Sequence, residues 1–250
     1  MTQFQIMSDL HIENYDDDVD YKNFITPKAD VLILAGDIGR VGRQTQLENF
    51  LKKLCPNFKA VLYVLGNHEY YKVDNYPEKT MNETRECIGE IAKKISNLYI
   101  LNRDSIIIGD VCIAGCTLWS YTTLNTIPSY IVRIKDINSV KYNSMFFEDL
   151  NYIKSMISYC RKNKLKLLVV SHYCPTYTVS KRKKRDKYTS LYCTNLDGLL
   201  MSSDIHTWIC GHVHKNFDLI TSGGTRLISN QKGKPKDNIL DFSLEKIINV

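Results

Sequence analysis

Short apolar runs recur along the chain, and five of them end next to a polar residue of a kind that can bind a metal. These runs predict strands over residues 3–8, 30–35, 60–65, 165–170 and 205–210. They are shorter than typical helices and are rich in Val, Ile and Leu, which favours strands. Further β-branched runs predict short strands over residues 99–101, 105–108, 111–115, 217–221 and 225–229. Gly109-Asp110 and Ser222-Gly223-Gly224 are typical hairpin turns between members of this second set.

Helical spacing of apolar residues appears between several of these strands. It predicts helices over residues 46–54, 77–96 and 146–163, and Pro56 ends the first of them. The apolar residues in 119–142 show neither helical nor strand-like spacing, and we expect this segment to run irregularly over the surface. Strands that alternate with helices early and form hairpins late indicate an α/β fold with mixed sheets.

Composition places few further limits on the chain. Its 250 residues are 44% hydrophobic and 24% charged, which is ordinary for a soluble protein and fits one domain over residues 1–250. No apolar run approaches the roughly 20 residues that cross a bilayer, and the N-terminus does not resemble a signal peptide. We therefore expect an intracellular, cytoplasmic protein with no membrane partner. The eight cysteines show no C-x-x-C pairing and are expected to be buried free thiols.

The net charge of +6 is informative only where it is concentrated. One basic run, residues 181–187, reads Lys-Arg-Lys-Lys-Arg-Asp-Lys. It is an electrostatic funnel for nucleic acid or a nucleotide, a solvated and mobile loop, or a localisation-like run. The general excess of lysine favours the solvated loop, whereas Tyr188 and Tyr192 nearby would allow base stacking. The acidic stretch over residues 13–20 is expected to be solvated.

Candidate chemistry lies in five clusters that follow the strand-like runs: Asp9-Leu10-His11, Gly36-Asp37, Gly66-Asn67-His68-Glu69, Ser171-His172 and Gly211-His212-Val213-His214. Taken singly, each polar residue is an ordinary turn or surface residue. Together, delivered by five strand ends, they predict a two-metal centre. Two divalent ions need roughly four protein ligands each, one of them shared. Asp37 is the natural bridge because a carboxylate has two oxygens, and Glu69 is expected to be structural.

The seven predicted ligands are Asp9, His11, Asp37, Asn67, His172, His212 and His214. Asp9 and His11, two residues apart on an extended backbone, point the same way and can share one ion. His68 remains as a protonatable side chain beside the site, which suits a general acid.

These motifs, DxH, GD, GNHE, SH and GHxH in that order, resemble the calcineurin-like metallophosphoesterase superfamily. The segments Asp104–Trp119 and Gly223–Gly233 also resemble one branch of it, the small, cap-less bacterial-type members. The resemblance implies an αββα sandwich of two mixed sheets flanked by helices. It also implies that Asp9, His11, Asp37 and His214 hold one ion, and that Asp37, Asn67, His172 and His212 hold the other. A metal-bridging hydroxide would attack phosphorus in line, while His68 protonates the leaving group. The oxygen and nitrogen ligands fit Mn, Fe or Zn.

Two departures from the family pattern concern the substrate. The Asp-Arg-Gly of the protein phosphatases is absent after Gly36-Asp37, so phosphoprotein specificity is not indicated, although Arg40 can still reach a phosphate oxygen. Tyr173 stands where many relatives carry a second histidine after the SH, and it is expected to shape the substrate pocket.

The sequence therefore predicts a dinuclear-metal phosphoesterase that hydrolyses a phosphomonoester or a phosphodiester. Two alternatives stay open: a nuclease or nucleotide phosphodiesterase that uses residues 181–187, and a non-catalytic metal-binding scaffold. The scaffold would be expected to lack ligands or His68, and every position is filled. The expected partner is a phosphorylated substrate, including nucleotides or nucleic acid, and the oligomeric state is left open.

Overall fold

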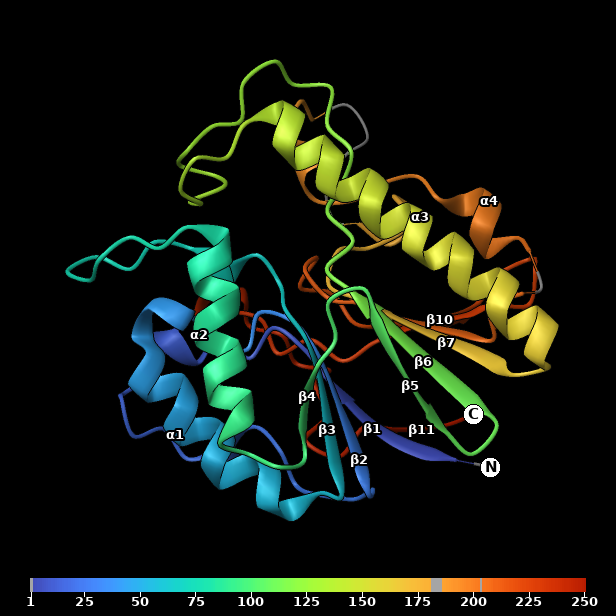
Figure 1. The fold of residues 1–250 in the computed structure, drawn as a ribbon, viewed down its shortest axis with the longest axis horizontal. Coiled ribbons are helices and arrows are strands. Elements are labelled where there is room, and N and C mark those ends of the chain that lie inside the picture. The colour runs from blue at the N-terminus through green and yellow to red at the C-terminus, as the bar shows by residue number, and fades with distance from the viewer. Residues whose placement is uncertain (1, 181–185, 203) are drawn as a thin grey trace.

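Two β-sheets pack face to face between two layers of helices (Figure 1). The computed structural model describes residues 2–180, 186–202 and 204–250. The first sheet has the strand order β11-β1-β2-β3-β4, built from β1 (Gln3–Met7), β2 (Val31–Ala35), β3 (Ala60–Val64), β4 (Leu98–Ile100) and β11 (Ile247–Asn249). Strands β1 to β4 pair in parallel, and β11 pairs antiparallel with β1 at the edge.

The second sheet has the order β5-β6-β7-β8-β10-β9. Its strands are β5 (Asp104–Ile108), β6 (Val111–Cys116), β7 (Lys166–Ser171), β8 (Thr207–Ile209), β9 (Phe217–Ile220) and β10 (Arg226–Ser229). The four central strands are parallel, whereas β5 and β9 pair antiparallel at the two edges. Both sheets are therefore mixed, as predicted.

Helices cover the outer face of each sheet. Helices α1 (Gln44–Leu54) and α2 (Met81–Lys93) lie beside β1 to β4, and α3 (Ser139–Asn163) and α4 (Asp197–Leu200) lie beside the second sheet (Figure 1). Short 3₁₀ turns connect the layers: η1 (Ile12–Asn14), η2 (Tyr21–Asn23), η3 (Val41–Arg43), η4 (Cys55–Asn57), η5 (His68–Tyr70), η6 (Thr189–Leu191) and η7 (Pro235–Asp237). The predicted αββα sandwich is confirmed.

Inner strands such as β2 are apolar on both faces because both faces are buried. On β2, Val31 and Ile33 belong to the core between the sheets, whereas Leu32 and Leu34 pack toward the helices. The inter-sheet core takes alternate residues from the inner strands of both sheets, so each sheet is held in place from two sides. This rigid base fixes the positions of the loops that leave the strand ends.

The structure differs from the predicted elements in a few places. Helix α2 begins at Met81 because the Thr80 hydroxyl and the Glu83 carboxylate form a capping box there. Helix α3 begins at Ser139, earlier than predicted, because the Asn138 side chain caps it. Strand β11 was not predicted.

Residues 117–138 are irregular, but the expectation that this segment runs over the surface was wrong for part of it. The Trp119 side chain is 2% exposed and packs between the rings of Tyr70, Tyr142 and Tyr173. In the part of the chain that the structure describes, no helix is both long enough and apolar enough to span a membrane.

Candidate metal centre

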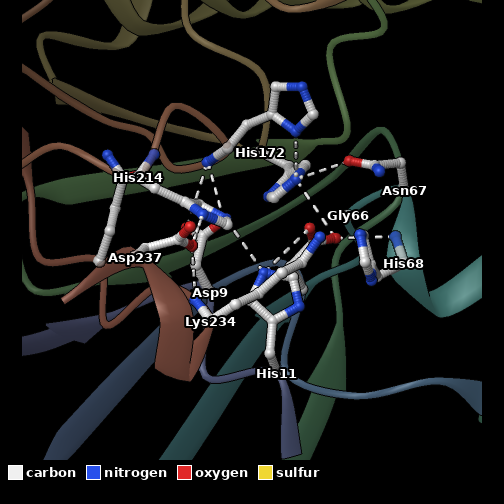
Figure 2. Close-up of polar contacts among 12 residues, drawn as sticks. Asp9, His11, Gly66, Asn67, His68, His172, His214, Lys234 and Asp237 are labelled. Carbon is white, nitrogen blue, oxygen red and sulfur yellow. Dashed lines mark hydrogen bonds and ion pairs between the residues drawn. The ribbon is translucent and has the colours of Figure 1, made fainter. Parts of the chain in front are cut away.

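The five predicted clusters meet at one edge of the sandwich. They follow the carboxyl ends of β1, β2 and β3 in the first sheet, and of β7 and β8 in the second. Since parallel strands end at the same edge of a sheet, the two sheets present their clusters to each other. Figure 2 shows the side chains of Asp9, His11, His172 and His214 converging on one region.

The backbone is left-handed at most of the predicted ligands. The φ angle is 54° at Asp9, 49° at His11, 54° at Asp37, 70° at His212 and 47° at His214. Non-glycine residues in this conformation cost roughly 1–3 kcal/mol each, and they cluster at functional sites. Five of them around one small region indicate that the geometry of these side chains is selected at the expense of stability.

Two glycines make room for the convergence. A β-carbon at Gly36, where φ is +86°, would collide with the imidazole of His172. A β-carbon at Gly66 would collide with the carboxylate of Asp37. The glycine that precedes a predicted ligand thus lets another predicted ligand approach its backbone closely.

One group of side chains, which we call the first cluster, consists of Asp9, His11 and His214. Nε2 of His11 lies 3.0 Å from Nε2 of His214, and Nε2 of His214 lies 3.3 Å from Oδ1 of Asp9. Asp9 and His11 are fully buried. One ligand atom from each of the three residues falls within 4.8 Å of the others, which fits a single cation.

The second cluster consists of Asn67, His172 and His212. Nε2 of His172 lies 3.0 Å from Oδ1 of Asn67 and 3.2 Å from Nδ1 of His212. The burial of His212 and the nearby His172 hold the pKa of His212 well below its usual value, so this imidazole is neutral and able to bind a metal.

Asp37 lies between the two clusters. Its Oδ1 is 3.3 Å from Nε2 of His172, and its Oδ2 is 3.7 Å from Nε2 of His11. One carboxylate therefore presents an oxygen to each cluster, which is the geometry of a bridging ligand.

Each of three histidines is oriented by an acceptor behind it. Nδ1 of His11 lies 3.1 Å from Oε1 of Glu13, and Nδ1 of His214 lies 2.5 Å from Oδ2 of Asp237. Nδ1 of His172 lies 2.9 Å from the carbonyl oxygen of Ala35. Acceptors in this position fix the tautomer and turn Nε2 inward, as is usual for metal-binding histidines.

Glu69 is structural, as the sequence indicated. Its carboxylate accepts hydrogen bonds from the backbone N–H groups of Asp37 (3.1 Å), Ile38 (2.7 Å) and Gly66 (2.8 Å), and from the Tyr63 hydroxyl (2.6 Å). These bonds join the loops after β2 and β3, so they fix the backbone on which Asp37 and Asn67 stand.

The buried charges of the site favour added positive charge. Burial opposes protonation of His172, yet the carboxylate of Asp37 raises the pKa of His172 to about 9. Burial likewise opposes ionisation of Asp37, but His172 and His68 hold the pKa of Asp37 well below its usual range. A site that holds a buried proton this tightly is electrostatically suited to a divalent cation in the place of that proton. The residues present thus fit the metals that the motifs imply.

His68 and Arg40 line a cavity of about 530 Å³ above the two clusters, together with Asp37, Asn67, His212 and His214. Tyr173 does not line it. The Tyr173 side chain is 1% exposed, and its ring packs against the ring of His212 at 4.1 Å between centroids. Its placement supports His212 and does not favour the predicted contact with substrate.

The sequence analysis did not identify two candidate functional residues, Glu13 and Asp237. Glu13 was assigned to a solvated acidic stretch, but its side chain is 4% exposed and contacts His11. Asp17 and Asp18 in the same stretch do lie on the surface, paired with Arg43 and Lys53. Asp237 carried no motif at all. In the basic run, residues 181–185 lie outside the described residues.

The sequence and fold of the chain match those of known phosphoesterases. The family model for calcineurin-like phosphoesterases matches residues 3–216. The chain belongs to this family. It is also 26% identical, over 93% of its length and 91% of the relative, to an uncharacterized protein, L509, of Acanthamoeba polyphaga mimivirus.

Several solved structures share the fold of the chain. The phosphopantetheinyl hydrolase of Mycobacterium tuberculosis matches 99% of the chain and 95% of its own length, with a TM-score of 0.75 and 13% identity. A dimetal phosphatase from Danio rerio matches 91% of the chain and 86% of its own length, with a TM-score of 0.58 and 12% identity. A Staphylococcus aureus protein assigned as a 5′-nucleotidase matches 91% of the chain and 48% of its own length, with a TM-score of 0.56 and 13% identity.

The family match and the fold make this phosphoesterase a metal-dependent phosphoric ester hydrolase that acts on a phosphorylated substrate. The side chains of the two clusters are its candidate divalent-metal ligands.

Proposed function

We propose that the chain hydrolyses phosphate esters with two divalent ions, one in each cluster, and that Asp37 is their shared ligand. The observation that carries the proposal is the position of Asp37, whose two oxygens face the two clusters separately. In this assignment Asp9, His11 and His214 complete the first ion's ligands. Asn67, His172 and His212 complete those of the second, and the ions are Mn, Fe or Zn.

The ions, when bound, supply an activated water and neutralise the charge of the phosphoryl group. The chain contributes the rest. The rigid strand ends and the hydrogen bonds of Glu69 keep the ligands at fixed separations, so little reorganisation is needed as the reaction proceeds. Arg40 lines the cavity, and in this proposal its guanidinium holds a phosphate oxygen.

His68 is the proposed general acid. It lines the cavity, and its backbone N–H donates to Oδ1 of Asp37 at 2.8 Å, which fixes it beside the shared ligand. Burial lowers the pKa of His68 to about 4, while the carboxylates of Asp37 and Glu13 act in the opposite direction. A bound phosphate dianion adds negative charge next to the ring and favours its protonated form.

A second candidate substrate class, nucleotides or nucleic acid, is favoured by the basic and aromatic side chains that line the cavity. Arg133, Lys234 and Lys236 line the cavity along with Arg40. These four cationic side chains outnumber the carboxylates of Asp37 and Asp237 in the lining, which suits a substrate with several negative charges. Tyr130 also lines it, and its hydroxyl lies 2.6 Å from that of Tyr188. An exposed aromatic ring such as that of Tyr130, beside cationic side chains, can stack on a base.

Salt dependence separates the two substrate classes. If an oligonucleotide is the substrate, its apparent affinity falls steeply between 50 and 200 mM salt, because several phosphates are neutralised at once. A small phosphomonoester has few charges, so its KM changes only weakly over that range.

The decisive experiment is turnover of p-nitrophenyl phosphate and bis-p-nitrophenyl phosphate with added Mn²⁺, for wild type and His68→Gln. We expect turnover by wild type and a fall of roughly 10²–10⁴-fold in the variant, with both metals retained. The ratio of the two substrates then distinguishes monoesters from diesters. Two bound metals without turnover of any ester would instead favour the scaffold alternative.

A further inference from the structure

Glu13 is a buried carboxylate beside the site, and it is not one of the predicted metal ligands. Support of the ligand His11 explains only part of its contacts. It stands two residues after His11 in the turn η1, and its side chain is 4% exposed. A role for Glu13 at this site rests on the proposed function, because it concerns His68, the residue proposed as general acid.

One oxygen of Glu13 contacts two histidines from different strand ends. Its Oε1 lies 3.1 Å from Nδ1 of His11 and 2.9 Å from Nδ1 of His68. The two rings meet edge to face, with 4.5 Å between centroids and an interplanar angle of 78°. Nε of Arg40 lies 3.7 Å from the same oxygen.

The other oxygen of Glu13 has no hydrogen-bond partner among the described residues, although it is buried. A buried carboxylate oxygen without a partner costs stability. Glu13 is therefore poorly explained as a stabilising residue, and a role in the chemistry of its two histidines accounts for it better.

An ionised Glu13 accepts the Nδ1–H of both rings. The contacts to His11 (3.1 Å) and His68 (2.9 Å) are at hydrogen-bond distance, and an ionised carboxylate can only accept, so each ring is the donor. With Nδ1 protonated, Nε2 of His11 is left as the metal-binding atom. In His68, the same bond leaves Nε2 as the ring nitrogen for the cavity.

The remaining contacts of the His68 ring do not specify this orientation. The ring packs on Tyr71, with 4.5 Å between centroids and an interplanar angle of 31°. Such packing is nearly the same when the imidazole is turned by 180° about its Cβ–Cγ bond, a turn that exchanges Nδ1 with a carbon. Among the described residues, only Glu13 is hydrogen-bonded to a ring nitrogen of His68.

We propose that Glu13 is a positioning residue that orients the general acid His68 and the metal ligand His11 through a single carboxylate oxygen. Placement of the acid and placement of the first cluster are then parts of one hydrogen-bonded unit.

The activity test is a double-mutant cycle of Glu13→Gln and His68→Gln, with the exposed Glu90→Gln as the matched control. Alone, Glu13→Gln is expected to lower kcat about 10–100-fold, the usual effect of losing such a partner. With excess Mn²⁺ to keep the first cluster loaded despite the altered contact with His11, it should cost less than about threefold in the His68→Gln background, since the His68 ring is absent. The loss should be larger for phenyl phosphate than for p-nitrophenyl phosphate, because the more basic leaving group needs the proton more.

A second measurement does not depend on turnover. The chain has six histidines, so ¹⁵N long-range correlation spectra can resolve their tautomers. In metal-free wild type, His68 should show Nδ1–H, and Glu13→Gln or Glu13→Ala should shift it toward a mixture of tautomers. Metal content, measured by mass spectrometry with excess Mn²⁺, should stay at the wild-type level in Glu13→Gln.

The outcomes separate the alternatives. Fully additive losses in the cycle, equal for both leaving groups, would overturn the role of Glu13 in orienting His68. An unchanged His68 tautomer in both Glu13 variants would do the same. If wild type turns over no ester while the tautomer shifts as expected, the proposed function fails and the positioning by Glu13 stands.

Discussion

The two clusters differ in what stands behind their histidines. In the first cluster, His11 and His214 each have a carboxylate at Nδ1, from Glu13 and Asp237. In the second, His172 has a backbone carbonyl at Nδ1, and the ring of His212 packs between those of Tyr173 and Tyr192. A carboxylate behind an imidazole makes it a stronger donor to a cation, and a neutral carbonyl does so less.

The formal charges differ in the same direction. The first cluster has Asp9 to itself, whereas the unshared ligands of the second, Asn67, His172 and His212, are all neutral when they bind a metal. This difference indicates that two ions that share one bridging ligand can still be bound with different affinities. We expect the first cluster to hold its ion more tightly.

The largest expected effect comes from the one residue that the clusters share. Asp37→Asn removes the bridging charge, so metal loading should fall to one ion or fewer and kcat by more than about 100-fold, beyond the range for a supporting residue. Metal analysis after gel filtration and turnover of p-nitrophenyl phosphate measure both. Unchanged two-metal loading would count heavily against the assignment.

Removal of the metals with a chelator should show directly that the two clusters differ in metal affinity. Stepwise titration of the loaded protein with a chelator should release the ions in two stages, with the ion of the second cluster leaving first. In Asn67→Ala, only the first stage should shift to a lower chelator concentration. A single stage at equal affinity would refute the comparison.

The two clusters should also respond differently to the loss of a supporting carboxylate. Asp237→Asn should weaken the ion of the first cluster about 10–100-fold and leave the affinity of the second cluster nearly unchanged. Excess Mn²⁺ should restore turnover, because the ligands themselves are intact. Asp241→Asn, nearby in sequence but outside the lining of the cavity, is a suitable control.

A pH dependence is expected from His172. Its pKa of about 9 in the metal-free protein means that the imidazole is protonated at neutral pH and must release that proton to bind a metal. The apparent affinity of the second cluster should therefore rise as pH increases, by up to about tenfold per unit between roughly pH 6.5 and 8.5. Calorimetric titrations at three pH values check the slope, which should flatten in His172→Asn.

The smallest effect is expected at Tyr173. Tyr173→Phe keeps the ring that packs on His212 and removes only a buried hydroxyl, so KM should change less than about twofold and stability by about 1 kcal/mol. A large rise in KM with unchanged metal loading would instead restore the contact with substrate that the sequence suggested.

The parts of this structure that could be predicted from sequence are those with a local signal. Asp9, Asp37 and His172 come within two residues of the end of an apolar run, so both their strands and their common edge could be inferred. Glu13 had no such signal, because it begins an acidic stretch whose other members do lie on the surface, and its partner His68 is 55 residues away. Asp237 reaches His214 from a turn after β10 that no spacing rule connects to it.

Element ends show the same limit. The cap of α3 at Asn138 depends on one side chain in a stretch without a period, and β11 is only three residues long and is defined by its pairing with β1. Such features depend on contacts between distant parts of the chain, and a pattern along the sequence does not carry them.

The left-handed ligands imply a trade-off between activity and stability. Glycine adopts a positive φ freely, so replacing His214 or Asp37 by glycine removes backbone strain that alanine would keep. In the metal-free protein such a glycine variant should be more stable than the matching alanine variant, although both are inactive. The positions that make this chain an enzyme are therefore among those where selection for stability alone would choose another residue.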